Sequence, residues 1–133
     1  MFLGEYNHNL TSGKRLALPK KIRNRITGDE VILARGTENC INGFDKVAWE
    51  KAGNEYLAVP LYEEKGRKIR RQMFAGAQEA TIDVQGRVVL PDVLMSWAGI
   101  KGEMTVIGAG DHFEIWDSST WKTYLRKIEA KEG

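Results

Sequence analysis

The chain has few of the residues and patterns that mark secreted, metal-binding or membrane proteins. Its single cysteine, Cys40, cannot form a disulfide within the chain, so nothing indicates an oxidising compartment. Its two histidines, His8 and His112, are far apart, and no HExxH or CxxC pattern occurs, so we expect no metal site. No apolar run approaches the roughly 20 residues of a membrane span, and residues 1–5 lack the features of a secretory signal. These absences predict a cytoplasmic protein.

Catalytic patterns are also scarce. Gly108–Gly110 has two glycines of a dinucleotide-binding fingerprint without the third, in a turn between expected strands. Asp111, His112 and Glu114 are close in sequence, which could suit general acid–base chemistry. A strand, however, would place Asp111 on the face opposite to the other two, which favours a polar strand edge or a subunit contact. We therefore expect no enzyme activity, no cofactor and no small-molecule substrate.

What the chain does contain fits a small globular protein with local basic patches. Of its 133 residues, 42% are hydrophobic and 29% charged, and this length can bury a sizeable core. The net charge of +2 says little, but residues 1–28 hold six basic residues and one acid. Residues 65–71 hold five more basic residues and no acid. Such patches can meet a polyanion, or they can be solvated faces with acids nearby.

An internal repeat is the strongest pattern in the sequence. Arg15–Pro19 and Arg87–Pro91 match at an offset of 72 residues, and the same offset aligns Trp49 with Trp121. The chain is therefore predicted to contain two copies of one unit, packed about a pseudo-twofold axis. The predicted boundaries are a first unit over 1–52, a helical linker over 53–77, and a second unit over 78–133 with a C-terminal helix.

Each copy is predicted to form a hairpin, a short helix, two strands and a longer helix. In the second copy, Asp83–Gly86 suits a type I turn whose last residue has positive φ. Val88 and Leu90 point inward from the return strand, which Pro91 ends. The other elements expected in this copy are a helix over 92–98 that buries Val93, Leu94 and Trp97 and stops at Gly99, strands over 104–108 and 112–116, and a helix capped by Asp117.

The first copy follows the same plan. Thr11–Lys14 forms its turn, and Leu16 and Leu18 point inward from its return strand. The other expected elements are strands over 6–10, 31–35 and 39–44, a short helix with Ile22 and Ile26 on one face, and a helix that Asp45 caps and that carries Trp49. The linker over 61–77 is predicted to be helical, with its basic residues exposed and with Tyr62, Ile69, Met73 and Phe74 near one stripe.

One arginine opens each return strand, directly after the turn. A guanidinium held there by a rigid hairpin can reach a phosphate or the edge of a guanine. Two such groups about a twofold axis match the symmetry of duplex DNA. Alternatively, each arginine is a structural latch on a nearby carboxylate, as Asp83 could be for Arg87. From these residues alone, DNA contact by Arg15 and Arg87 and a latch role remain open.

Several segments closely resemble the MraZ family, in order and over nearly the whole chain. They are Asp83–Pro91, Trp97–Gly99, Gly110–Asp117, Met1–Gly4 and Arg71–Ala77. The resemblance implies an α+β fold in which two tandem AbrB-like swapped-hairpin units form one pseudo-twofold β-barrel core with flanking helices.

The resemblance also implies a function. The family consists of sequence-specific DNA-binding transcriptional regulators, usually repressors, of the bacterial division and cell wall gene cluster. They bind short direct repeats in its promoter. The resemblance further implies ring-shaped homo-oligomers, commonly octamers, that associate with the nucleoid, with double-stranded DNA as partner and no membrane contact.

The family's DNA-contact motif, Asp-x-x-x-Arg, is intact in only one copy. Asp83 and Arg87 match it, whereas Thr11 replaces the aspartate in the first copy and Arg15 remains. Gly13-Lys14 stands where the family usually has Lys-Gly, which suits a type II turn and leaves Lys14 as an undirected charge. The expected DNA-binding residues are therefore Arg15, Arg87, Lys14 and Asp83. Two other functions stay open: an interaction module whose arginines make subunit contacts, and a regulator of another operon, as AbrB-like antitoxins are.

Overall fold

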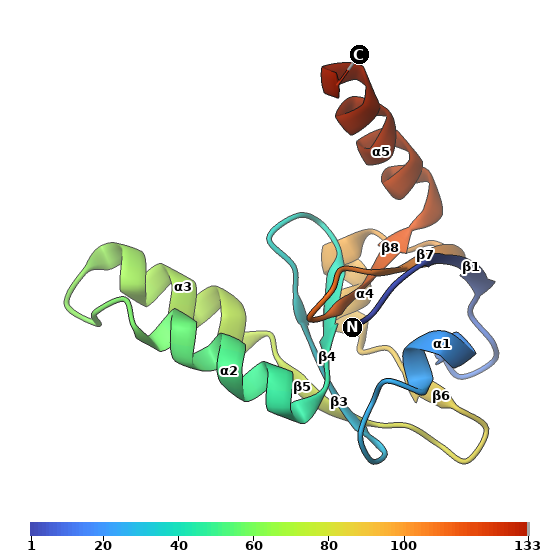
Figure 1. The fold of residues 1–133 in the computed structure, drawn as a ribbon, viewed down its shortest axis with the longest axis horizontal. Coiled ribbons are helices and arrows are strands. Elements are labelled where there is room, and N and C mark those ends of the chain that lie inside the picture. The colour runs from blue at the N-terminus through green and yellow to red at the C-terminus, as the bar shows by residue number, and fades with distance from the viewer. Residues whose placement is uncertain (133) are drawn as a thin grey trace.

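The computed structural model describes residues 1–132, which form eight strands and five helices (Figure 1). The first elements along the chain are β1 (Glu5–Asn9), β2 (Arg15–Ala17), α1 (Lys20–Arg23), β3 (Glu30–Arg35), β4 (Ile41–Phe44) and α2 (Lys46–Leu57). The others are α3 (Glu64–Ala75), β5 (Gln78–Thr81), β6 (Arg87–Val89), α4 (Asp92–Ala98), β7 (Glu103–Gly108), β8 (Phe113–Asp117) and α5 (Ser118–Glu132). Both halves therefore contain, in the predicted order, two short strands joined by a turn, a short helix, two strands and a longer helix. The predicted pairing of the first two strands as a hairpin is wrong, because β1 pairs with β7, β5 with β3, and β2 with β6.

The strands form two separate sheets. Six of them make one antiparallel sheet in the order β1-β7-β8-β4-β3-β5, and β2 pairs with β6 alone. The predicted α+β class is confirmed, but the expected closed barrel is wrong, because β1 and β5 are the open edges of the larger sheet. Pro19 and Pro91 follow the return strands, and proline cannot donate to a strand ladder. The return strands therefore pair over three residues each, which is too short to join the two edges.

The strand pairing is symmetric between the two copies. β1 pairs with β7 of the other copy, and its counterpart β5 pairs with β3. Two residue pairs lie on the axis, because each joins a residue to the one 72 positions later. They are Leu16 with Val88 in the small sheet and Asn42 with Glu114 in the large one. Each copy thus lends its first strand to the other, and neither copy has a sheet of its own.

One hydrophobic core takes side chains from both copies. Leu16 and Val88 of the small sheet are fully buried in it, together with Phe113 of β8. Ile22 of α1 and Leu94 of α4 enter the same core from the two short helices. The short helices and the small sheet are therefore fixed to the large sheet by shared apolar burial.

The two short helices differ in length. α4 confirms the helix predicted over 92–98 and ends at Gly99, whose φ of 62° is the left-handed conformation typical of helix stops. Leu94 faces the core, but Val93 is 55% exposed, so its predicted burial is wrong; on this short helix the adjacent residue points away from the core. α1 is a single turn, and Ile26 is buried beyond its end.

The longer helices project from the sheet. α2 and α3 run side by side as a helical hairpin, and α5 extends from a different part of the sheet (Figure 1). As predicted, Asp45 caps α2 by accepting the Val47 amide at 2.9 Å, and Asp117 accepts the Thr120 amide at 3.4 Å where α5 begins. No helix within residues 1–132 is both long enough and apolar enough to cross a bilayer.

Aromatic side chains join α2 to α3. The Phe74 ring meets Trp49 and Tyr56 edge to face, at centroid distances of 5.9 and 6.1 Å. Met73 is buried, in agreement with the predicted apolar stripe. Tyr62, placed on that stripe by its spacing, is instead 82% exposed, because the chain forms a loop there and α3 begins only at Glu64.

Candidate nucleic-acid interface

The small sheet places the two predicted arginines on one face. Leu16 and Val88 at its centre point into the core. Because strand side chains alternate, Arg15 and Arg87 point the other way and are partly exposed. Each arginine lies opposite the residue two positions after the other arginine, so the two stand diagonally across the pseudo-twofold axis. Two guanidinium groups 72 positions apart in sequence thus share one outer surface.

The second turn holds its arginine in place. Asp83 Oδ1 accepts the amides of Gln85 and Arg87 at 2.9 Å each, and Asp83 Oδ2 accepts Arg87 Nε at 3.1 Å. The Gly86 amide donates to the Asp83 carbonyl at 2.9 Å, and Gly86 has a φ of 80°, as predicted for this turn. The Arg87 amide, foremost among these donors, lowers the pKa of Asp83 below its usual value. The latch uses only Nε, so the terminal nitrogens of Arg87 stay available for a ligand.

The first turn lacks this latch. The Thr11 hydroxyl donates to the backbone carbonyl of Arg15 at 3.2 Å and does not contact the guanidinium. Within residues 1–132 the Arg15 side chain has no hydrogen bond or ion pair. It lies beside Gly13, where an added Cβ would stand 2.7 Å from Arg15 Nη1. Arg15 therefore shares the position of Arg87 but is oriented less strictly.

Lys14 has an unusual conformation and a definite partner. Gly13 has a φ of 77°, and Lys14 has a φ of 57°. It is the one residue other than glycine within 1–132 with positive φ, and it occupies the position of Gly86 in the repeat. Its Nζ pairs with Asp92 Oδ1 at the start of α4. The expectation of an undirected charge is therefore wrong, because the fold brings an acid from the other copy to this lysine.

Each turn is tied to the other copy by a backbone hydrogen bond. The amide of Leu18 donates to the Gly86 carbonyl, and the amide of Leu90 donates to the Lys14 carbonyl, both at 3.0 Å. These two bonds are related by the pseudo-twofold axis. They connect the end of each return strand to the opposite turn, so the arginines are carried by a cross-linked and rigid platform.

Part of the basic stretch of α3 binds the loop that connects α2 to α3. Arg67 Nη1 donates to the carbonyls of Leu61 and Tyr62 at 3.1 and 3.0 Å, and Arg70 Nη2 donates to that of Val59 at 3.2 Å. These carbonyls lie in the connection between α2 and α3. Two of the five basic side chains of residues 65–71, all predicted to be exposed, are therefore engaged in holding this loop.

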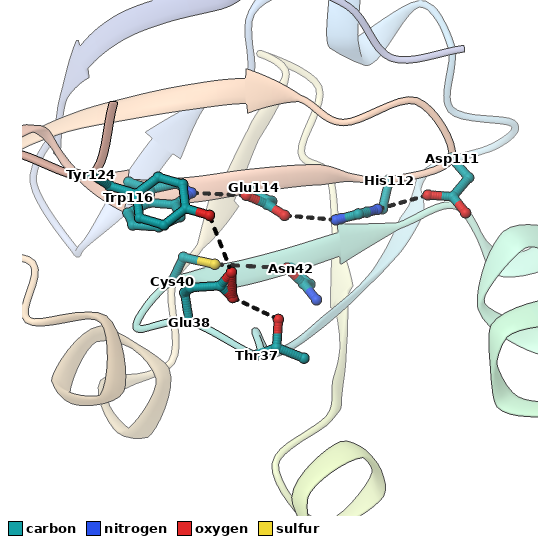
Figure 2. Close-up of polar contacts among 9 residues, drawn as sticks. All are labelled: Thr37, Glu38, Cys40, Asn42, Asp111, His112, Glu114, Trp116 and Tyr124. Carbon is teal, nitrogen blue, oxygen red and sulfur yellow. Dashed lines mark hydrogen bonds and ion pairs between the residues drawn. The ribbon is translucent and has the colours of Figure 1, made fainter. Parts of the chain in front are cut away.

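A polar cluster at the start of β8 contains the three residues whose spacing could suit acid–base chemistry, Asp111, His112 and Glu114 (Figure 2). His112 contacts Asp111 through Nδ1 at 2.7 Å and Glu114 through Nε2 at 2.8 Å, and Trp116 Nε1 donates to Glu114 at 2.9 Å. The expectation that strand geometry separates Asp111 is wrong, because β8 begins at Phe113 and Asp111 lies in the preceding turn. The Phe44 ring stacks on the imidazole at a centroid distance of 5.4 Å.

The electrostatics of this cluster favour a charged histidine. The hydrogen bond to Glu114 raises the pKa of His112 above its ordinary value, although partial burial opposes the charge. Burial also opposes ionisation of Glu114, but the hydrogen bonds from His112 and Trp116 outweigh it and lower the pKa of Glu114. Each polar group of the cluster is thus hydrogen-bonded or ion-paired to another group of the same cluster.

Cys40 and the acidic residues offer little further chemistry. The Cys40 side chain is buried, and burial raises the pKa of its thiol far above the ordinary value. In the part of the chain that the structure describes, no three side chains of His, Cys, Asp and Glu are grouped so that they could hold a metal.

Two residues that lie against the turns, Asp92 and Arg23, are not predicted by any local sequence pattern. Asp92 of α4 reaches Lys14, and Arg23 of α1 lies against the second turn, where a Cβ on Gly86 would stand 3.0 Å from Arg23 Cδ. Each comes from the short helix of the copy that does not supply the turn. The repeat was the available signal, because exchange of strands between copies brings each short helix to the opposite turn.

Comparison with known proteins identifies the relatives of this chain. The family model described as "MraZ protein, putative antitoxin-like" matches residues 1–72 and 73–132. A protein of Leuconostoc citreum named "Transcriptional regulator MraZ" is 39% identical over 124 residues, which are 93% of this chain and 86% of that protein. Proteins of the same name from Micrococcus luteus and a Roseiflexus species are 40% and 34% identical over 130 residues, 98% of this chain and 90% of each relative. The repeated match and the extent of these similarities show that the chain belongs to the MraZ family.

Proposed function

We propose that this chain is a sequence-specific DNA-binding transcriptional regulator that contacts DNA with the outer face of the β2–β6 sheet. The observation that carries the proposal is the placement of Arg15 and Arg87 on one face of a rigid platform, across a twofold axis. An arginine can fork to a guanine edge or a phosphate, and twofold-related arginines suit a duplex. The names of the relatives support a role in transcription.

The finer proposal follows the family resemblance. The chain acts as a repressor of the division and cell wall gene cluster by binding short direct repeats in its promoter, in the cytoplasm and on the nucleoid. It requires no cofactor and catalyses no reaction. The exchange of first strands between the copies supports two AbrB-like swapped-hairpin units, over 1–52 and 78–133, joined by a helical linker over 53–77.

The two arginines contribute unequally in this proposal. Arg87 is held by Asp83 and loses less freedom on binding, so it discriminates bases. Arg15 has no such partner within residues 1–132, so it contacts DNA with less directional preference. Lys14 adds charge beside it, reduced by its ion pair with Asp92.

Fluorescence anisotropy with two duplexes tests this function: one carries the direct repeats upstream of the protein's own gene, and one has the same bases scrambled. Arg87→Ala is expected to cost about 1–3 kcal/mol per base contact and to reduce the preference for the repeats. Arg15→Ala is expected to weaken binding to both duplexes more evenly. Unchanged thermal melts and unchanged particle mass are the controls that show both variants to be folded.

The outcomes separate the alternatives. Equal losses of preference from the two folded variants would contradict the inequality of Arg15 and Arg87. Wild-type DNA affinity in both variants would remove DNA contact from this face. A change of oligomer mass in Arg87→Ala or Arg15→Ala, with DNA binding lost only in consequence, would favour the interaction module.

We further propose that the chain forms a homo-oligomeric ring, in line with the family resemblance. One protomer presents a single pair of arginine turns, whereas several short repeats require several pairs held in register. Multivalent attachment can raise avidity by roughly 10² to 10⁴ over one contact. Multi-angle light scattering at micromolar concentration should give a multiple of the 15.0 kDa protomer mass; a monomer would refute the ring.

A further inference from the structure

The two turns of the small sheet have different charges around them, although the strand pairing is symmetric. Each turn packs beside the short helix of the opposite copy. In the repeat, Lys20 and Arg23 of α1 occupy the positions of Asp92 and Met95 of α4. The helix beside the second turn thus offers two cations where the helix beside the first offers an acid and a methionine.

Arg23 is the residue of this set closest to the second turn. Gly86 has no Cβ, and the Arg23 side chain lies close to the position that one would take, with Cδ 3.0 Å and Nε 3.1 Å from it. Arg23 is partly exposed, and it has no ion pair or side-chain hydrogen bond within residues 1–132. The Arg23 guanidinium therefore lies next to Gly86, the residue before Arg87. Its stem packs against the turn, and its positive charge is not paired with an acid within residues 1–132.

The first turn shows the opposite arrangement. Asp92 at the start of α4 binds Lys14, and Met95 lines the same hollow beside them. The acid offsets the lysine, so the cationic character of this turn rests on Arg15. An approaching polyanion accordingly meets the greater free charge at the second turn.

We propose that Arg23 is a further DNA-contact residue, which binds a backbone phosphate beside the base that Arg87 reads. The contact site is then composite: the second copy supplies the turn and the first copy supplies the helix. Phosphate contacts fix the register of a protein on the duplex, whereas base contacts specify sequence. Arg23 thus positions the DNA so that the latched Arg87 meets a base edge. This inference rests on the proposed function.

The test measures how DNA affinity depends on salt in the full-length protein, by anisotropy with the same two duplexes. Arg23→Met installs the residue found at the equivalent position of α4. It should lower the slope of log affinity against log salt by about 0.9, the contribution of one phosphate. Because a phosphate carries no sequence information, the preference for the repeats over the scrambled duplex should stay within twofold of wild type.

Two variants control for charge and for packing. Arg126→Met removes an exposed arginine from α5 and should leave the slope unchanged. Arg23→Lys keeps the positive charge that neutralises the phosphate, so it should keep the wild-type slope. If Arg23→Met does not fold, Arg23→Gln, which has a neutral but polar end group, replaces it in the comparison.

A gain-of-charge variant tests the other turn. Asp92→Asn frees Lys14 from its ion pair, so the slope should increase by up to about 0.9 and affinity for both duplexes should rise. An unchanged slope in folded Asp92→Asn protein would contradict the charge difference between the two turns.

The failures can be told apart. If wild-type protein and Arg87→Ala bind both duplexes equally, the proposed function itself is wrong. If Arg87→Ala loses its preference but folded Arg23→Met or Arg23→Gln has the wild-type slope, only the role of Arg23 is refuted. A loss of sequence preference in Arg23→Met, as large as that of Arg87→Ala, would also overturn it, because it would make Arg23 a base-reading or structural residue.

Discussion

Glycine at position 14 of the first turn should give a more stable protein than alanine there. Lys14 has a φ of 57°, a conformation that costs a residue with a Cβ about 1–2 kcal/mol. Lys14→Gly removes this cost and repeats the arrangement of Gly86 in the second turn, whereas Lys14→Ala keeps a Cβ in the left-handed conformation. The greater entropy of the unfolded glycine variant offsets about 0.4–1 kcal/mol of this difference.

The ion pair of Lys14 with Asp92 does not affect this comparison. Its side chains are 56% and 74% exposed, and a pair this exposed contributes about 0–1 kcal/mol. Both variants lose it, so its loss cancels. The expected difference between Lys14→Gly and Lys14→Ala is thus about 1 kcal/mol, or about 4 °C in Tm for a chain of this length.

Thermal melts followed by circular dichroism measure the difference, with urea unfolding as a second assay. Lys14→Ala is the matched control, because it also removes the ion pair but keeps a Cβ in the left-handed conformation. A folded Lys14→Ala protein with a Tm equal to or above that of Lys14→Gly would refute the reasoning, since it would show that a Cβ at position 14 is not strained.

Two other predictions concern parts of the fold away from the turns. His112 should titrate above its ordinary pKa in NMR experiments. Its charged form stabilises the fold below about pH 6.5, and this contribution is lost as pH rises through the raised pKa. A stability that does not change over this pH range would contradict the prediction. Gly66→Ala should cost about 1–3 kcal/mol in urea unfolding, because the new Cβ would stand 2.1 Å from the Pro60 carbonyl oxygen, whereas Gly102→Ala, with open space around it, should be neutral.

The parts of the fold that the sequence predicts are those fixed by neighbouring residues. The turn at Asp83–Gly86 and the stop at Gly99 depend on hydrogen bonds and φ values within a few positions, and both are as predicted. Barrel closure depends on which distant strands pair and over what length. Pro19 and Pro91 mark locally where the return strands end, but no local pattern shows that β2 pairs with β6 alone and leaves the large sheet open.

The same distinction applies to the candidate site. Alternation along the return strands correctly predicts that Arg15 and Arg87 point away from the core. The partner of Lys14 is 78 residues away in sequence, so only the packing of one copy against the other identifies it. The helical stretch around Arg67 shows the converse error, because a run of basic residues there looks like a free surface, yet its side chain is bound to loop carbonyls.

The exchange of first strands has a consequence for how the chain folds. β1 cannot pair until β7 exists, and the two strands join positions as far apart as Glu5 and Ile107. Such contacts require large loops to close first, which slows folding relative to helical proteins of the same size. During synthesis on the ribosome, β1 and β2 of the first copy therefore cannot pair until the second copy has been made. A truncated product that ends before β6 has no partner for β2, so it lacks the platform that presents Arg15.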